Sequence, residues 1–258
     1  MSDIADVQSL QDGRDLPIDQ VGIKALLYPI SILDGQGEVQ HSVAEFDLSV
    51  RLPAHAKGTH MSRFIEALET YGQTFSLQTL QAFMQKLHEK MDAERVFLVC
   101  RFPYFIRKRA PKSGRESLMD YQVSLRAAFG PDHCNISVQL VVPVKTLCPA
   151  SKKMSAYGAH NQRSHITLDL TLNDTAHHFE YFIQLAEQQA SSELFAVLKR
   201  ADEKAITEQA YDNPKFVEDL TRDIALKLKV CSSVKSFSVT CENFESIHNH
   251  SAFARISG

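Results

Sequence analysis

The sequence predicts an α+β fold built on an antiparallel sheet with one covered face. Segments with an apolar residue at every second position recur along the 258-residue chain, which is typical of half-buried strands. Segments with apolar residues at helical spacing lie between them. A strand pair, a helix pair and a strand pair occur in this order twice. We therefore expect two tandem units, residues 20–131 and 132–258, after an N-terminal arm of residues 1–19.

The strand predictions rest on alternation of apolar and polar side chains. In residues 44–52, Ala44, Phe46 and Leu48 point one way, and the polar residues between them point the other way. The same alternation, or a shorter form of it, predicts strands at 123–129, 136–144, 166–172, 237–241 and 252–256.

The helix predictions rest on apolar stripes that recur every three or four residues. These stripes cover residues 61–71, 77–91, 179–186 and 216–224. Thr59 is expected to cap the first helix, and Asn213-Pro214 to start the last, with Asn as cap and Pro in the first turn. The Met and Phe residues in these stripes are expected in the core.

Composition narrows the class of protein. The formal net charge of −3 lacks the basic excess of a nucleic-acid surface, and no apolar run approaches the roughly 20 residues of a membrane helix. Five cysteines without CxxC spacing, and no signal peptide, predict reduced thiols in a cytoplasmic protein. The Walker A, GxGxxG and GxSxG motifs are absent from the sequence.

The densest polar segment spans residues 145–165, between two predicted strands. It contains Cys148 and His160, and thiolate and imidazole are both good ligands for zinc or ferrous iron. Two ligands alone are weak support for a metal site. The alternative is a half-buried cysteine and a capping histidine in a connecting loop.

Acidic residues concentrate in residues 199–219, where most are expected on a solvated helix surface. Glu218 differs, because it lies beside Val217 and one turn from Leu220. We therefore expect its side chain to be partly buried near the apolar stripe.

Two further polar clusters carry histidines. His248 and His250 are two positions apart and face the same way on an extended chain, with Glu245 three residues before His248. Histidines of near-neutral pKa suit proton transfer, although an exposed polar loop would look the same.

The other cluster, residues 57–64, directly precedes a predicted helix. Lys57, His60 and Arg63 could bind phosphate there, because a helix N-terminus favours anions. A capped surface helix is the alternative interpretation of this cluster.

Taken together, these segments resemble GTP cyclohydrolase type IB, a family of the tunnelling-fold superfamily. The matching strings occur in the family's order over nearly the whole chain: QVGIKALLYPI, KGTHMSRF, LCPASKKMSAYGAHNQRSH, LKRADEK, YDNPKFVED and SFSVTCENFESIHNHSAF. The resemblance implies a tunnelling fold with two units per chain, and a homotetramer with active sites at subunit interfaces. It also implies conversion of GTP and water into 7,8-dihydroneopterin triphosphate and formate, the first step of tetrahydrofolate synthesis and, in many bacteria, of queuosine synthesis.

The resemblance assigns roles residue by residue. The metal ligands map onto Cys148, His160 and Glu203, with water in the fourth position, and zinc, manganese or ferrous iron would suit this set. Glu218 corresponds to the carboxylate that anchors the guanine edge. His248 corresponds to the residue that moves protons at the imidazole ring.

Glu245 and His250 are the expected neighbours of that histidine. Lys57, His60 and Arg63 are candidates for the triphosphate contacts, from the same subunit or a neighbouring one.

One departure from the family pattern concerns the second thiol. Many members carry Cys-Pro-Cys where this chain has Cys148-Pro149-Ala150. The ligand position is kept, so activity is expected to survive, but any role of the second thiol cannot be carried over.

Two other functions remain open at this point. A nitrile reductase of queuosine synthesis with the same fold would use NADPH and Cys148 as a nucleophile, but would not need His160 and Glu203 as ligands. A non-catalytic purine- or pterin-binding protein would not need to retain the set of ligands and proton-transfer residues.

Overall fold

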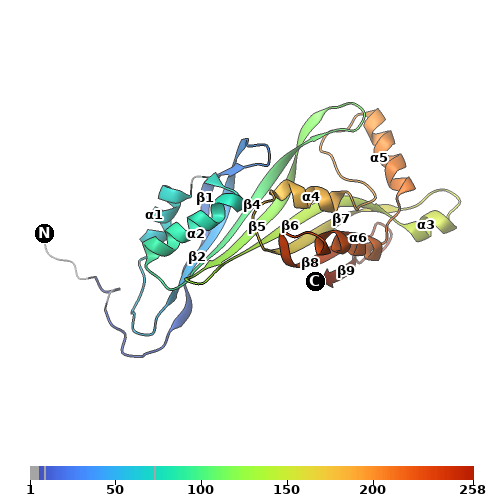
Figure 1. Cartoon of the computed structure of the whole chain (residues 1–258). Helices are drawn as coiled ribbons and strands as arrows, with labels where there is room; N and C mark the ends of the chain where they lie inside the picture. Colours follow the sequence, from blue (N-terminus) through green and yellow to red (C-terminus); the bar gives the residue numbers. More distant parts are fainter. Residues whose placement is uncertain (1–5, 9, 73) are drawn as a thin grey trace. The chain divides into compact units, whose positions relative to one another are not determined.

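The protein is represented by a computed structural model that describes residues 6–8, 10–72 and 74–258. It has mixed α and β structure, as predicted (Figure 1). The strands are β1 (Ile18–Leu33), β2 (Val39–Leu52), β3 (Thr74–Phe75), β4 (Val96–Arg109), β5 (Glu116–Phe129), β6 (Cys134–Leu147), β7 (Asn161–Leu172), β8 (Val234–Asn243) and β9 (Ala252–Ser257). The helices are α1 (Ser62–Tyr71), α2 (Leu77–Met91), α3 (Pro149–Met154), α4 (Phe179–Glu187), α5 (Arg200–Asp212) and α6 (Val217–Lys229).

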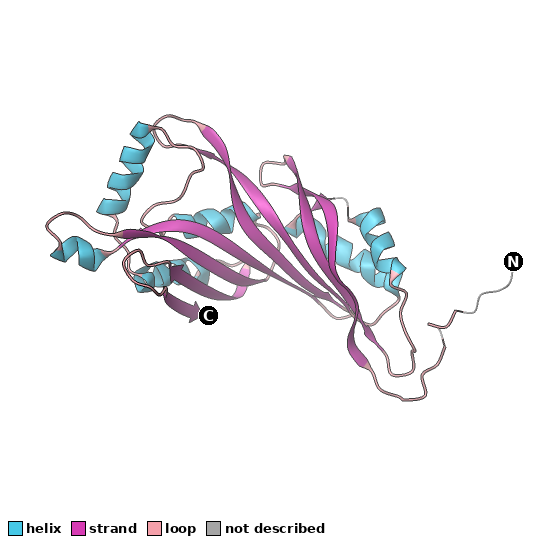
Figure 2. Ribbon diagram, turned by 180° about the vertical axis from the view of Figure 1, so that it is seen from behind, coloured by secondary structure: helices cyan, strands magenta, loops and turns pink. Residues whose placement is uncertain are grey.

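The hydrogen-bonded order of the strands is β3-β1-β2-β4-β5-β6-β7-β8-β9. Figure 2 shows the strands in magenta and the helices in cyan. Apart from the short β3, the strands follow the sequence order, although helices lie in the chain between the antiparallel neighbours β2 and β4 and between β7 and β8. The β7–β8 pairing places His165 opposite Glu242, and the β8–β9 pairing places Cys241 opposite Ala254. All six predicted strands fall within observed ones.

The chain forms two compact units, each assembled from two stretches of sequence. The first comprises residues 1–102 and 124–137, and the second comprises residues 103–123 and 138–258. Strands β4, β5 and β6 each contribute residues to both units. The tandem units 20–131 and 132–258 were inferred from the order of elements, and they remain a proposal.

The core of the first unit lies between β2 and the pair α1 and α2. Phe64 of α1, Leu80 and Met84 of α2, and Phe46 of β2 are all fully buried. The Phe75 ring lies 5.5 Å from the Phe46 ring, measured between centroids. The predicted helical stripes therefore face the predicted apolar side of the strand.

The predicted cap of α1 is wrong. This helix begins at Ser62, and its N-cap, Met61, makes no side-chain capping bond. Thr59 lies too far before the first turn to serve. Ser76, by contrast, caps α2, because its hydroxyl accepts a hydrogen bond from the Thr79 N–H at 3.1 Å.

The core of the second unit lies under α4 and α6. Phe182 and Ile183 of α4 and Leu220 and Ile224 of α6 are buried against the apolar side of the strands. On β7, Ile166, Leu168 and Leu170 are buried and alternate with half-buried residues, which confirms the expectation of one covered face.

The predicted start of α6 at Asn213-Pro214 is wrong. Asn213 instead ends α5, and its side chain donates to the Ala190 carbonyl at 2.8 Å. The helix α6 begins at Val217, where the Asp219 carboxylate accepts from the Phe216 N–H at 3.2 Å. Pro214 therefore lies in the connection between the two helices.

The predicted N-terminal arm, residues 1–19, packs in part against residues 55–57. Residues 1–5 and 9 lie outside the described residues. Gln11 forms an isolated β-bridge with Ala56, and the Asp12 N–H donates to the His55 carbonyl at 2.8 Å. Among the described helices, none has the length and apolar character needed to span a membrane.

Candidate functional site

The polar segment 145–165 comprises the end of β6, the short helix α3 and the start of β7. Cys148 is the N-cap of α3, and its Sγ accepts from the Ser151 N–H at 3.4 Å. The Cys148 N–H in turn donates to the His160 carbonyl at 3.1 Å. The Ser151 hydroxyl accepts from the His160 N–H at 3.2 Å. The structure thus brings Cys148 and His160 together, both half-buried, although twelve positions separate them in sequence.

The ring of His160 is held from another segment. Its Nδ1 lies 3.3 Å from the Ser246 hydroxyl oxygen, in the connection between β8 and β9. The start of that connection is attached to β7, because the Phe244 N–H donates to the Arg163 carbonyl at 3.0 Å. The two predicted clusters, around His160 and around residues 242–250, therefore meet.

His248 and His250 lie in a bend of this connection, not on the extended chain that was predicted. The rings of His248 and His250 are parallel within 8° and their centroids are 5.1 Å apart. Both side chains are exposed, and Glu245 is half-buried. His250 Nδ1 lies 3.3 Å from the Ser251 carbonyl oxygen, and the role of the pair in proton transfer stays a prediction.

Helix α5 carries the third predicted metal ligand, Glu203, on its first turn with an exposed side chain. The preceding residue, Asp202, is fully buried. Asp202 accepts hydrogen bonds from the N–H groups of Lys112, Ser113 and Lys199, at 2.7–2.9 Å, and from the Ser113 hydroxyl at 2.6 Å. These bonds attach the first turn of α5 to the β4–β5 connection.

Glu203 does not form a group with Cys148 and His160, the other two predicted ligands. No group of three His, Cys, Asp or Glu side chains in the described part of the chain is placed to hold a metal ion. Lys152 of α3 lies over the ring of Tyr211, 4.1 Å from its centroid. Tyr211 follows Glu203 by eight residues, about 12 Å along the helix. The chemistry of the donors, a thiolate, an imidazole and a carboxylate, nevertheless fits zinc, manganese or ferrous iron.

Glu218 lies in the first turn of α6 and is exposed, so the expectation of partial burial is wrong. Val217 and Leu220 face the core, which turns the intervening carboxylate toward solvent. The connection before α6 is attached near Cys148, because the Lys215 N–H donates to the Leu147 carbonyl at 3.0 Å. Glu218 is therefore available to bind a ligand.

Lys57, His60 and Arg63 belong to the first compact unit. His60 Nε2 is 3.2 Å from the Asp6 carboxylate, and the backbone N–H of Lys57 donates to the Leu10 carbonyl at 3.2 Å. Arg63 lies in the first turn of α1. Their proposed contact with triphosphate stays a prediction.

A buried polar network was missed in the sequence. Gln162 donates from Nε2 to the Thr146 hydroxyl at 3.0 Å, and the Thr146 and Ser164 hydroxyls are 2.9 Å apart. The Ser164 hydroxyl donates to Asn243 Oδ1 at 2.7 Å. Thr146 and Ser164 stand at positions where the alternation along β6 and β7 would place an apolar side chain. A polar residue at such a position was the signal that could have revealed this network.

Ala150 lies on the first turn of α3 and is exposed. The position of the family's common second thiol is therefore at the surface, two residues from Cys148.

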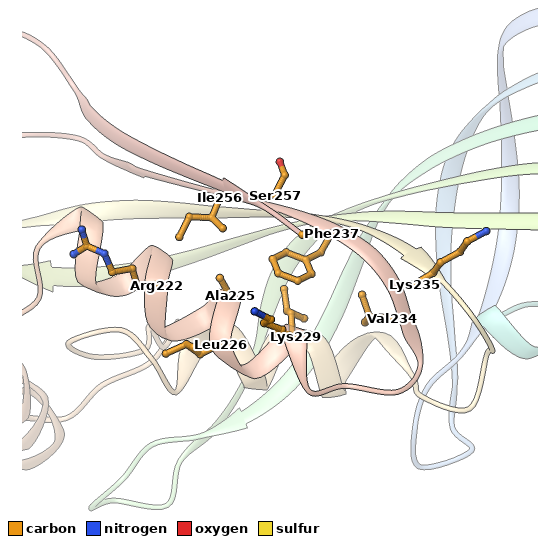
Figure 3. Close-up of a pocket in the computed structure, with 11 residues that line it drawn as sticks. Arg222, Ala225, Leu226, Lys229, Val234, Lys235, Phe237, Ile256 and Ser257 are labelled. Carbon is orange, nitrogen blue, oxygen red and sulfur yellow. The ribbon is translucent and has the colours of Figure 1, made fainter.

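An apolar hollow of about 460 Å³ lies elsewhere in the second unit, between α6 and the strands β8 and β9 (Figure 3). Phe237 is at its centre, facing Ala225 and Lys229 of α6, and Ile256 of β9 lies nearby (Figure 3). None of the predicted site residues lines it, and its lining holds no cysteine, histidine or acidic side chain. It is therefore distinct from the predicted metal site.

Comparisons with known proteins agree over the length of the chain. Residues 4–254 match the family model described as type I GTP cyclohydrolase folE2. A GTP cyclohydrolase FolE2 from Methylobacillus flagellatus is 49% identical over 253 residues, which cover 98% of this chain and 95% of that protein. A GTP cyclohydrolase FolE2 2 from Dechloromonas aromatica is 49% identical over 255 residues, covering 99% and 94%.

A uricase from Arthrobacter globiformis has a similar structure, with a TM-score of 0.50 and 8% sequence identity, covering 98% of this chain and 95% of that one. At that identity the likeness concerns the fold alone, and it confirms the tunnelling fold. The relatives favour neither a nitrile reductase nor a non-catalytic binding protein. The chain belongs to the type I GTP cyclohydrolase folE2 family.

Proposed function

We propose that this protein is a metal-dependent GTP cyclohydrolase of type IB. It converts GTP and water into 7,8-dihydroneopterin triphosphate and formate. The observation that carries the proposal is the juxtaposition of Cys148 and His160, held by a 3.1 Å backbone hydrogen bond, in a chain 49% identical to named GTP cyclohydrolases. In the cell, the reaction supplies tetrahydrofolate synthesis in the cytoplasm, consistent with the five free cysteines.

Cys148, His160 and Glu203 would hold one divalent metal, zinc, manganese or ferrous iron. The bound metal supplies an activated water for attack on C8 of the purine. Ligation by Glu203 requires α5 to approach α3, or a Glu203 side chain from a neighbouring copy, because the described chain does not place this carboxylate beside the other two ligands.

Glu218 binds the guanine edge in this proposal. Its exposed carboxylate can accept both a ring N–H and an exocyclic N–H, and such paired bonds to a charged acceptor are strong and directional. The N-terminus of α6 favours the negative charge that this role requires.

His248 moves protons at the imidazole ring of the substrate, with His250 and Glu245 as neighbours. The parallel rings, 5.1 Å apart, allow one histidine to bind while the other exchanges protons with solvent. Lys57, His60 and Arg63 are proposed to bind the triphosphate. We propose a homotetramer with active sites at the subunit interfaces.

The proposal is tested by stripping the protein with a chelator, then restoring zinc, manganese or ferrous iron and supplying GTP. The product is measured as a fluorescent pterin after oxidation. We expect turnover to require metal, and Cys148→Ala to lower it by more than about 100-fold, since even losses outside the ligand shell reach that size. Cys231→Ala, at another half-buried thiol, is the matched control.

Two results would contradict the proposal in different ways. Full metal content and full rate in Cys148→Ala would refute the assigned site. Metal-loaded protein that makes no pterin from GTP would refute the function and favour a non-catalytic binding protein.

A further inference from the structure

Ser246 lies in the connection that carries the paired histidines, and its hydroxyl contacts the ring of His160. The distance between Ser246 Oγ and His160 Nδ1 is 3.3 Å. The backbone of His160 is joined to Cys148, whose N–H donates to the His160 carbonyl at 3.1 Å. Cys148 therefore fixes the backbone of this histidine, and Ser246 fixes its ring.

The contact has a chemical consequence for the imidazole. A neutral imidazole has one N–H donor and one acceptor nitrogen. When Nδ1–H of His160 donates to the Ser246 oxygen, Nε2 keeps the lone pair that a metal ion needs. Histidine ligands in metal sites commonly use their second nitrogen in this way, and the outer partner orients the ring.

We propose that Ser246 is a positioning residue, which orients the His160 ring, accepts a hydrogen bond from Nδ1–H when a metal ion occupies Nε2, and links metal binding to residues 244–251. This rests on the proposed function only in taking His160 as a ligand. The residue does not touch substrate or metal.

The link to the histidine pair follows from how this connection is attached. At one end the Phe244 N–H donates to the Arg163 carbonyl at 3.0 Å, and at the other Ala252 pairs with Asn243. Ser246 lies between these attachments, and the exposed His248 and His250 follow it. Because coupling between sites is reciprocal, a metal that steadies His160 also steadies this connection.

The experiment compares Ser246→Ala, Ser246→Thr and the matched control Ser251→Ala. Ser251 is an exposed serine of the same connection, and its contact with His250 uses its backbone carbonyl, which the substitution keeps. Zinc affinity is measured by chelator competition, and cobalt binding by the absorption band between thiolate and cobalt. We expect Ser246→Ala to weaken metal binding by about 10- to 100-fold, with Ser246→Thr close to the unmodified protein and Ser251→Ala unchanged.

A second readout is hydrogen exchange. Zinc should slow amide exchange in residues 244–251 of the unmodified protein and of Ser246→Thr, but not of Ser246→Ala. Because Ser246 is exposed, the thermal midpoint of the metal-free protein should not change.

Equal zinc affinity in Ser246→Ala and the unmodified protein would overturn the inference. So would a Ser246→Thr variant as weak as Ser246→Ala, because the hydroxyl would then not be what matters. The cobalt–thiolate band tests the proposed metal centre itself. If the band is absent from the unmodified protein, or persists in Cys148→Ala, both the metal centre and this inference are overturned.

Discussion

At the scale of single residues, the cysteines fall into two groups according to their surroundings. Burial raises the pKa of the Cys241 thiol to about 11. Burial also raises the pKa of the Cys100 thiol, to well above its usual range. Both are therefore protonated and shielded at neutral pH. Cys148 is half-buried at the start of α3, and its backbone N–H is bonded to the His160 carbonyl.

This difference predicts the pattern of alkylation. With iodoacetamide at pH 8, the native protein should be modified at Cys148 and should remain unmodified at Cys100 and Cys241, because the thiolate is the reactive form. Zinc should protect Cys148. Peptide mass spectrometry measures each site. Labelling of Cys241 at the rate of Cys148, or labelling of Cys148 that zinc does not slow, would contradict the assignment.

A buried ion pair gives a pH-dependent prediction. Lys108 donates to the Glu187 carboxylate at 2.8 Å, and the Tyr121 hydroxyl donates to the same oxygen at 2.6 Å. Burial raises the pKa of Glu187, although the hydrogen bonds from Lys108 and Tyr121 oppose that change. The protonated carboxyl is thus favoured in the folded state, so the group's contribution to stability is largest at low pH and is lost as the pH rises through the folded-state pKa.

Lys108→Met should destabilise the protein by about 3–5 kcal/mol at neutral pH, because it leaves a buried carboxylate without its cation. The pKa of Glu187 should then rise further, so the loss should shrink toward pH 5 as the carboxyl becomes protonated. Urea unfolding at pH 5 and pH 7.5 measures both values. An equal loss at the two pH values would show that the charge of Glu187 is not responsible.

At the scale of elements, α5 packs against the rest of the second unit through few buried residues. Only Asp202, Ile206 and Ala210 of this helix are buried. The hydrogen bonds from Lys112 and Ser113 to Asp202 hold its first turn, and Glu203 is the next residue. The placement of this predicted ligand therefore depends on a carboxylate that itself has no role in ligation.

Asp202→Ala should release the start of α5 without unfolding the core. Amide exchange should speed up in residues 199–206, and zinc affinity should fall by about 10-fold or more. Glu208→Ala is the control, since this exposed residue of the same helix pairs with the exposed Lys204. If exchange in this segment is unchanged, the carboxylate does not attach the helix.

The elements also show how far sequence reasoning reaches. The strands β2, β5, β6 and β7 were predictable because alternation follows directly from one covered face. The start of α6 was missed, because the Asn213 side chain bonds to a distant carbonyl rather than capping the helix.

The site was predictable to a similar extent. The pairing of Cys148 with His160 could be predicted because both lie at the ends of neighbouring strands that one short connection joins. The position of Glu203 could not, since it depends on the tertiary attachment of α5 through Asp202, a residue that breaks an apolar stripe.

At the scale of the whole molecule, the proposed assembly gives its own prediction. A homotetramer would have a mass of about 116 kDa, four times the 29.0 kDa chain. Light scattering coupled to size exclusion measures this mass. If the sites lie between subunits, hybrids of Arg63→Ala and Cys148→Ala chains should regain activity that neither variant has alone. A stable active monomer would refute interface sites.

The central claim is that this protein opens the purine ring of GTP and releases C8 as formate. Its most direct test follows GTP carrying carbon-13 at C8 by NMR, in the presence of the zinc-, manganese- or iron-loaded protein. The account predicts that the label appears in formate, one for each pterin formed, and that Cys148→Ala abolishes the signal while Cys231→Ala preserves it. Label that stays in the purine, or formate release that does not depend on Cys148, would contradict it.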